Sequence, residues 1–309
     1  MRGHTPVLLE EVLAGLNVQP GGWYVDCTYG RGGHTAAILE RSGPHGRVLA
    51  IDRDPQAIDA ARERFAGEPR LTLMHGTFGR LAEIATDAGL NQRVDGVLFD
   101  LGVSSPQLDQ GERGFSFSQD GPLDMRMDPS QGPSAAEWLA RVSERELERV
   151  IRQYGEERYA RRIARAVAAA RRVLPLTRTA QLAELIAQAV PTREPGKHPA
   201  TRTFQAIRIQ VNAEFEELEA GLAQAVDLLK EGGRLCAISF HSLEDGIVKR
   251  FIQREATGDP VWAGLPDVPA HARPRLRRIG RAVHPEVSEI ERNPRARSAV
   301  LRAAERLAT

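Results

Sequence analysis

The sequence predicts an α/β fold, in which a doubly wound parallel sheet is interrupted by an all-helical insertion. Short apolar strands alternate with helical segments as far as residue 106 and return after residue 213, a pattern typical of parallel sheets. The first strand, residues 23–27, continues directly into a glycine-rich loop and a helix. No strand pattern occurs within residues 107–212. We therefore expect a discontinuous sheet domain, residues 1–106 and 213–309, around a helical insertion, residues 107–212.

Composition limits the classes of function. The 309 residues can form two units, and 42 basic residues nearly balance 41 acidic ones, so a nucleic-acid surface would have to be local. Cys27 and Cys236 offer neither a disulfide framework nor a metal cluster, which suits a reducing compartment. No signal peptide or bilayer-spanning apolar run is recognisable, so we expect a cytoplasmic protein without a membrane partner.

The elements of the sheet domain follow from apolar periodicity and helix punctuation. Residues 4–16 form a helix with one apolar face, and Asp54 is placed to cap a helix over residues 55–65. A capping box is expected at Ser242 and Asp245, after the fifth strand. Strands are expected at residues 23–27, 48–51, 71–74, 94–99 and 234–240, with a late antiparallel strand at 299–301.

Helix signals fill the insertion. Two capping boxes begin at Ser134 and Ser143. Further helices are expected at residues 157–174 and 180–190, and one long helix over residues 200–230 returns the chain to the sheet and ends at two glycines.

The glycine-rich loop suggests a nucleoside-containing cofactor. Gly30, Gly32 and Gly33 allow a tight turn that leaves backbone N–H groups open to a ligand. Asp52 ends the second strand about 20 residues later, where a carboxylate can accept hydrogen bonds from ribose hydroxyls. The pattern D-x-x-x-G-x-G-G is closer to S-adenosylmethionine (SAM) methyltransferases than to dinucleotide enzymes. On the loop alone, a dinucleotide or a purely structural turn stays open.

Four polar or aromatic residues follow strand ends at the same edge of the expected sheet. Asp100 could contact the cofactor or a target base, and Ser104 could face a target amine or simply complete a turn. Phe78 could cover an adenine or anchor the next helix in the core. His241 could read a base or carry a proton, or it could belong to a helix-capping turn.

Nine ordered motifs then identify a family resemblance. The chain closely resembles the bacterial small-subunit rRNA cytosine-N4 methyltransferases, the MraW family, over essentially its whole length. The motifs are HTPVLL at 4–9, the glycine loop, DLGVSSPQ at 100–107, GFSF at 114–117, DGPLDMRMD at 120–128, YGEE at 154–157, HPATRTFQ at 198–205, SFHSLED at 239–245 and NPRARS at 293–298.

The resemblance implies a Rossmann-like class I methyltransferase that uses SAM to methylate the N4 amine of a cytidine in 16S rRNA, near the decoding centre. It implies cofactor contacts at Gly32, Gly33, His34, Asp52, Phe78, Asp100 and Gln107. We expect Asp100, Ser104 and His241 to be the candidate catalytic residues, and direct transfer without a covalent enzyme intermediate. No metal and no DNA partner are expected, and the choice between monomer and homodimer stays open, as does that between free rRNA and an assembled subunit.

Two arginine clusters are candidates for RNA binding. Residues 161–178 contain six arginines and residues 273–281 contain five, with no acidic residue in either stretch. Such runs are usually solvated faces, but the family resemblance favours RNA contacts, at Arg161, Arg165, Arg172, Arg273 and Arg275. Phe115 and Phe117 could stack on bases or pin the insertion to the sheet domain.

Three other functions remain as alternatives at this stage. A DNA amine methyltransferase is disfavoured by the DLGVSS turn at residues 100–105. An RNA-binding assembly factor without turnover is disfavoured by the intact glycine loop, Asp52 and Asp100. A dinucleotide oxidoreductase is the weakest alternative.

Overall fold

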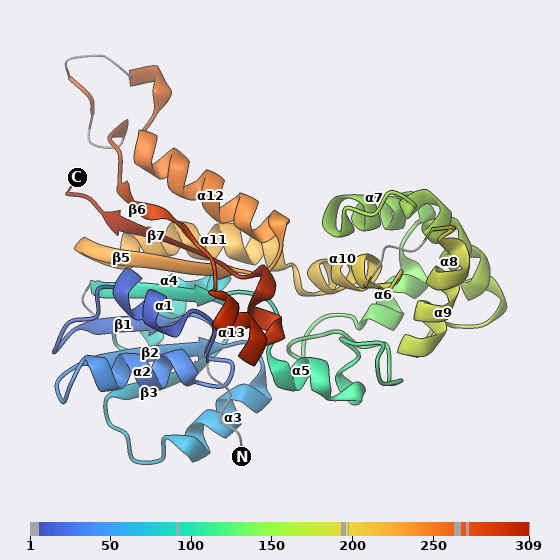
Figure 1. The fold of residues 1–309 in the computed structure, drawn as a ribbon, viewed down its shortest axis with the longest axis horizontal. Coiled ribbons are helices and arrows are strands. Elements are labelled where there is room, and N and C mark those ends of the chain that lie inside the picture. Colours follow the sequence, from blue (N-terminus) through green and yellow to red (C-terminus); the bar gives the residue numbers. More distant parts are fainter. Residues whose placement is uncertain are drawn as a thin grey trace. The chain divides into compact units, whose positions relative to one another are not determined.

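The computed structural model describes residues 6–90, 93–192, 196, 198–262, 267–269 and 272–308. The chain divides into two compact units, which are described separately (Figure 1). The sheet unit comprises Met1–Gly102 and Phe215–Thr309, and the helical unit comprises Val103–Glu214. The predicted boundaries lie within four residues of these limits.

The sheet unit contains a seven-stranded sheet in the order β3-β2-β1-β4-β5-β7-β6. The first five strands in this order are parallel, and β7 and β6 are antiparallel additions at one edge. This topology confirms the predicted α/β class and the late antiparallel strand. The strands are β1 (Trp23–Asp26), β2 (Arg47–Asp52), β3 (Leu71–His75), β4 (Val94–Asp100), β5 (Leu229–Ser239), β6 (Leu276–Val283) and β7 (Val300–Arg306).

Alternating side chains of the central strands enter two separate cores, because successive strand residues point to opposite faces. Val97 and Phe99 of β4 belong to one core, which α4 (Leu81–Asp87), α11 (Glu214–Leu228) and α12 (Ser242–Thr257) help to build. Leu98 belongs to the other core, to which α1 (Leu9–Gly15), α2 (Gly33–Arg41) and α3 (Pro55–Arg64) contribute. Helices therefore cover both faces, as the near-continuous apolar strand β4 requires.

Helix starts in the sheet unit agree only partly with the sequence signals. Asp54 caps α3 as predicted, since its carboxylate accepts the Gln56 N–H at 3.0 Å. Helix α1 begins only at Leu9, because Leu8 adopts a left-handed conformation with φ 53°. Residues 4 and 5 of the predicted helix lie outside the described residues. A short helix α13 (Val287–Arg292) precedes β7.

Two predicted features of a helix and one predicted capping box are wrong, and one strand was missed. The long helix over residues 200–230 is two helices, because Ala213 adopts φ 50° between α10 (Thr201–Asn212) and α11. The two glycines at 232 and 233 lie inside β5 and do not end a helix. Strand β6 was not predicted at all, since its run of arginines hides any apolar alternation. The N-cap of α12 is His241 and not Ser242, which is already the first helical residue, and Asp245 pairs with Arg302.

The helical unit packs its helices around a core of its own. Both predicted capping serines are confirmed: Ser134 accepts the Glu137 N–H and Ser143 accepts the Glu146 N–H. Only the first is a full capping box, because the Glu146 side chain pairs with Arg149. Its helices are α5 (Ser105–Asp109), α6 (Ala135–Arg141), α7 (Glu144–Gly155), α8 (Ala160–Val173), α9 (Thr179–Ala189) and α10. None of the described helices, in either unit, has the length and apolarity needed to cross a membrane.

Candidate active site

Three aspartates mark one edge of the parallel sheet. Asp26, Asp52 and Asp100 are the last residues of β1, β2 and β4. Parallel strands end at a common edge, and the strand order reverses direction between β1 and β4. In open α/β sheets, ligands bind in the crevice at such a switch point. The topology therefore places the candidate site at these three carboxylates.

The glycine-rich loop requires glycine at two positions for steric reasons. Gly32 has φ 68°, and a Cβ there would lie 2.4 Å from the Tyr29 ring. A Cβ on Gly33 would lie 2.3 Å from Pro6 Cγ. Helix α2 starts at Gly33, so its first-turn N–H groups have no partner within the helix and are available to a ligand.

Asp52 is tied to the loop and to the next helix. Its Oδ2 accepts the Gly30 N–H at 2.7 Å, and its Oδ1 accepts the Asp54 N–H at 2.8 Å. Burial raises the pKa of Asp52 to about 6, against the opposing effect of these two hydrogen bonds. A carboxylate offers about four acceptor sites, so two remain for ribose hydroxyls. The geometry suits the role expected for Asp52.

His34 and Asp100 form a charged pair beneath the loop. His34 is 5% exposed, and its Nε2 lies 3.0 Å from the Val7 carbonyl oxygen, an acceptor that requires a proton on Nε2. Its Nδ1 lies 3.5 Å from Asp100 Oδ2. Burial lowers the pKa of His34, but the hydrogen bond and negative charge of Asp100 outweigh it, and the net effect is a raised pKa. The Nδ1 contact therefore helps to orient Asp100.

The second carboxylate oxygen of Asp100 has no partner. Asp100 Oδ1 is buried and accepts no hydrogen bond from any residue that the structure describes. The Asp100 backbone N–H donates to Thr28 Oγ1 at 2.6 Å, which fixes the end of β4 against the loop. A buried carboxylate oxygen without a donor is costly, so it indicates a place for a ligand N–H or O–H group.

Asp26 is a site residue that the sequence reasoning missed. It is 1% exposed, accepts the Thr35 hydroxyl at 2.6 Å and the Thr28 N–H at 3.1 Å, and so braces both ends of the glycine loop. Burial raises the pKa of Asp26, although Thr35 lowers it. Its position, the last residue of the strand before the glycines, was the available signal.

Phe78 packs in the core of the sheet unit, which is one of the two roles expected for it. Its ring packs edge-on against Phe99, with ring centroids 5.4 Å apart, and a Cβ on Gly221 would lie 3.0 Å from it. The ring is half-buried, so these contacts support the anchoring role, and an adenine contact stays a prediction.

His241 caps helix α12. Its side chain accepts the Glu244 N–H at 3.4 Å, and its Nε2 lies 3.0 Å from Glu244 Oε1, without hydrogen-bond geometry. Glu244 is 2% exposed and also accepts the Phe240 N–H at 2.9 Å. The capping alternative therefore holds, and a catalytic part for His241 stays a prediction.

Ser104 and Gln107 belong to the helical unit. They form a capping box at the start of α5, in which Gln107 Oε1 accepts the Ser104 N–H at 2.9 Å. Ser104 thus completes a turn, which is one of the two roles expected for it. A contact of Ser104 with the target amine and a contact of Gln107 with the cofactor stay predictions.

The arginines expected to bind RNA divide into two groups. Arg161, Arg165 and Arg172 are exposed on one side of α8, opposite its buried apolar residues, and we call them the α8 arginine face. None of the three forms an ion pair with another described residue. Arg275 is different: its Nε lies 2.7 Å from Glu255 Oε2 and its Nη1 2.9 Å from Asp227 Oδ1. These two pairs neutralise part of the charge that RNA would need, and an RNA contact at Arg275 stays a prediction. Arg273 is exposed and donates to the Val268 carbonyl at 2.9 Å.

Phe117 packs inside the helical unit. Phe115 is buried, and the Phe117 ring lies 4.9 Å from that of Phe204 and 4.5 Å from that of His198. These contacts give the Phe117 ring a structural role within its own unit, and base stacking or pinning of the insertion stays a prediction for both rings.

Comparison with known proteins places the chain in a family. A model of the MraW methylase family matches residues 1–307. The chain belongs to the MraW methylase family. It is 55% identical over 306 residues to the "Ribosomal RNA small subunit methyltransferase H" of Shewanella loihica, which covers 98% of this chain and 97% of the relative. The protein of the same name from Chromohalobacter salexigens is 56% identical over 305 residues, 98% of this chain and 92% of the relative.

A solved structure of an rRNA methylase from Streptococcus thermophilus aligns with 100% of this chain and 99% of its own, at 11% identity and a TM-score of 0.43. The MraW match over residues 1–307 confirms the predicted enzyme class, a SAM-dependent methyltransferase.

The residues at the sheet edge fit this cofactor. Asp52 retains acceptor sites for two ribose hydroxyls, and the first turn of α2 presents N–H groups that suit a carboxylate. The unpartnered Asp100 Oδ1 suits an N–H donor. The glycine-rich loop alone was compatible with a dinucleotide or with SAM as the cofactor. The family match decides in favour of SAM.

Proposed function

We propose that this MraW methylase transfers a methyl group from SAM to the exocyclic N4 amine of one cytidine in 16S rRNA, near the decoding centre. The observation that carries the proposal is Asp100 Oδ1, a buried acceptor without a donor at the switch point of the sheet. The name of the relatives, small subunit rRNA methyltransferases, supports the choice of RNA.

Each residue of the site has a distinct task in this proposal. Bound SAM supplies an electrophilic methyl group. Asp52 holds the ribose through charge-assisted hydrogen bonds, and the loop N–H groups bind the carboxylate. His34 orients Asp100 through the Nδ1 contact at 3.5 Å. Asp100 Oδ1 accepts an N–H group, either from the target amine or from the ammonium of the cofactor.

Direct transfer to nitrogen needs no enzyme nucleophile. Methylation at cytosine C5 would require a cysteine thiolate to add to the ring. Cys27 and Cys236 are 1% and 0% exposed, and burial raises the pKa of Cys27 and raises that of Cys236 to about 12. Both thiols stay protonated in apolar cores, where cysteine acts as a small hydrophobe. These properties support an amine acceptor and alignment as the main source of catalysis.

The helical unit supplies the RNA-binding surface in this proposal. The α8 arginine face offers three exposed guanidinium groups free of carboxylate partners among the described residues, which suits phosphates. Its charge is not neutralised locally, so its contribution to RNA binding should depend on salt.

A labelled-SAM transfer assay tests the proposal. Naked 16S rRNA, partly assembled particles and complete small subunits are offered in parallel, and the modified nucleotide is mapped by mass spectrometry of RNA fragments. We expect stoichiometric transfer to one cytidine in at least one substrate. Binding without any transfer would instead support an assembly factor.

Asp100→Ala separates the two possible partners of Asp100 Oδ1. If the carboxylate faces the target amine, turnover falls while the Kd for SAM, measured by calorimetry, stays within twofold. If it faces the cofactor, the Kd rises by roughly ten- to a hundredfold, the 1.5–3 kcal/mol of a charged hydrogen bond.

A further inference from the structure

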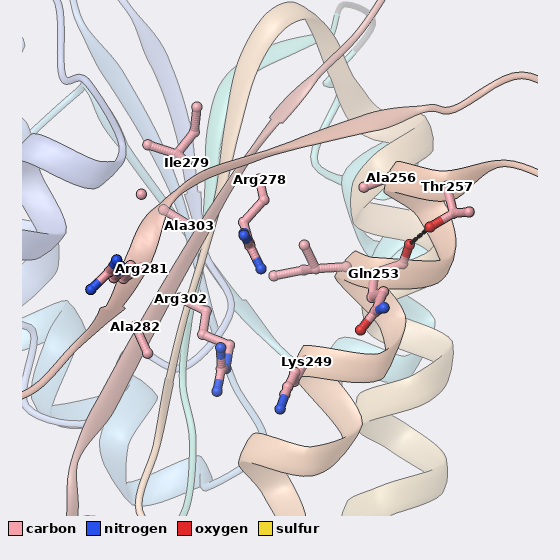
Figure 2. A pocket seen from close by; sticks show the side chains of 12 residues that line it. Lys249, Gln253, Ala256, Thr257, Arg278, Ile279, Arg281, Ala282, Arg302 and Ala303 are labelled. Carbon is pink, nitrogen blue, oxygen red and sulfur yellow. Dashed lines mark hydrogen bonds between the residues drawn. The ribbon is translucent and has the colours of Figure 1, made fainter.

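A hollow of about 160 Å³ lies in the sheet unit between α12 and the hairpin of β6 and β7. About 10–15 Å³ admits one water molecule, so the hollow has room for a much larger group. Figure 2 shows it from close by, with the polar ends of Lys249, Arg278 and Arg302 directed toward the space between helix and strands. None of the residues considered above for cofactor or catalysis lines it.

An irregularity in β6 creates the hollow. Ile279 pairs with Ala303 and Val283 pairs with Leu301, so four steps along β6 match only two along β7. The extra residues bulge out of the ladder at Gly280, which has φ 62°. Bulges redirect side chains locally and are over-represented next to functional sites.

The hollow combines an apolar floor with basic side chains that form no ion pair with the residues that the structure describes. Ile252, Ile279 and Ala303 contribute apolar surface. Lys249, Arg278 and Arg281 are exposed lining residues, and none forms an ion pair with another described residue. No described lining residue is acidic.

Arg302 is the exception among the basic lining residues. Its guanidinium makes a two-pronged contact with Asp245, with Nε to Oδ1 at 2.7 Å and Nη2 to Oδ2 at 2.8 Å. This pair neutralises Arg302 and anchors the strand to α12, so the uncompensated charge of the hollow comes from the other three cations.

Protection of an edge strand explains only part of this arrangement. Strand β6 is the outermost strand, and arginines or bulges on such strands discourage edge-to-edge aggregation. That function accounts for Arg278 and Arg281. It does not account for Lys249, which comes from α12, or for apolar surface left open beneath three cations.

We propose that this hollow is a second RNA subsite, which binds a single-stranded segment of the substrate outside the methyl-transfer site. Lys249 and Arg278 contact successive phosphates, and the aliphatic floor covers a ribose or an unstacked base. The inference rests on the proposed function for its choice of RNA. The sheet unit thereby holds the substrate independently of the α8 arginine face.

The test is the salt dependence of binding to deproteinised 16S rRNA for the double variant Lys249→Ala, Arg278→Ala. Each single-stranded phosphate contact contributes about 0.7 to the slope of log K against log salt, so the slope should become shallower by about 1.4. Scaled from 1 M to 0.15 M salt, this loss corresponds to roughly tenfold weaker binding. SAM affinity, measured by calorimetry, should not change.

A matched control removes two positive charges from the other end of the sheet. Arg47 and Arg93 are exposed and lie at the start of β2 and just before β4, so Arg47→Ala, Arg93→Ala should keep the wild-type slope. The charge-preserving variant Lys249→Arg, Arg278→Lys should also keep most of it. If the alanine pair binds deproteinised rRNA with the wild-type slope, the RNA subsite is refuted. It is also refuted if the variant binds more weakly than wild type only to intact subunits, and the occupant of the hollow is then a ribosomal protein.

Failure of the subsite and failure of the proposed function give different results. Wild-type methyl transfer together with an unchanged slope in the alanine pair refutes the subsite alone. A shallower slope without any methyl transfer by wild type supports the subsite and refutes the proposed function.

Discussion

Asp52→Asn should weaken SAM binding and remove a pH dependence that the wild-type protein possesses. The pKa of Asp52 is raised to about 6, so about nine-tenths of this carboxyl is protonated at pH 5 and almost none at pH 8. If only the ionised form accepts hydrogen bonds from both ribose hydroxyls, the apparent affinity for SAM at pH 5 is roughly elevenfold lower than at high pH, because only about one carboxyl in eleven is ionised there. Wild-type affinity for SAM should therefore rise with pH through about 6 and level off above 7.

Calorimetric titration of both proteins with SAM between pH 5 and 8 measures this effect. The ratio of the two affinities cancels the ionisation of the ligand itself. At pH 8 the asparagine variant should bind roughly ten- to a hundredfold more weakly, the 1.5–3 kcal/mol of a charge-assisted hydrogen bond. At pH 5 the ratio of the two affinities should be about elevenfold smaller, because only the wild-type affinity falls as this carboxyl is protonated.

Asp54→Asn is the matched control. It makes the same change two residues away, and asparagine caps a helix as well as aspartate, so α3 should keep its cap. At pH 8 its SAM affinity should equal that of wild type. Its affinity should still rise with pH, with a midpoint at or below that of wild type, because the negative charge of Asp54 helps to raise the pKa of Asp52. A ratio between wild type and Asp52→Asn that stays constant over this pH range, in folded proteins, would refute the reasoning.

Three further predictions concern the pair beneath the loop, the RNA surface and the cysteines. The raised pKa of His34 means that its contact with Asp100 stabilises the fold fully below the unfolded pKa of about 6.5 and less as pH rises through the folded value. Urea unfolding of His34→Gln should therefore show a loss of stability that is largest below pH 6.5 and shrinks at higher pH. A loss that grows with pH would contradict this sign. Alanine at all three residues of the α8 arginine face should make the salt slope for rRNA shallower by about 2 with SAM affinity unchanged, whereas an unchanged slope would make it a solvated face. Cys27→Ala, Cys236→Ala should retain methyl transfer at a stability cost of about 1–3 kcal/mol from two small cavities, and loss of activity in a folded double variant would contradict direct transfer.

The sequence sufficed for most of the sheet because strand burial and strand ends have local signals. The apolar run of β4 and the cap at Asp54 were predictable, as was the convergence of Asp52 and Asp100 at one edge. Strand β6 was not, because an edge strand with arginines and a bulge has no apolar alternation to detect. The break at Ala213 was equally hidden, since alanine is the strongest helix former and its left-handed φ is imposed by tertiary structure.

Partners of individual side chains were the least predictable part of the site. Arg275 and Arg161 look alike in the sequence, yet Arg275 pairs with two carboxylates, one of them 48 residues away, and Arg161 has no such partner among the described residues. The brace formed by Asp26 also depends on packing, because it needs the loop closed so that Thr35 reaches back to β1. Such contacts join distant segments and leave no periodic pattern in the chain.

The chemical identity of the product tests the central claim most directly. rRNA methylated by the enzyme is digested to nucleosides and compared with N4-methylcytidine and 5-methylcytidine standards by chromatography and mass spectrometry. The site described here, with an unpartnered acceptor at Asp100 and protonated, buried thiols at Cys27 and Cys236, predicts N4-methylcytidine as the sole product. Detection of 5-methylcytidine would contradict the amine mechanism.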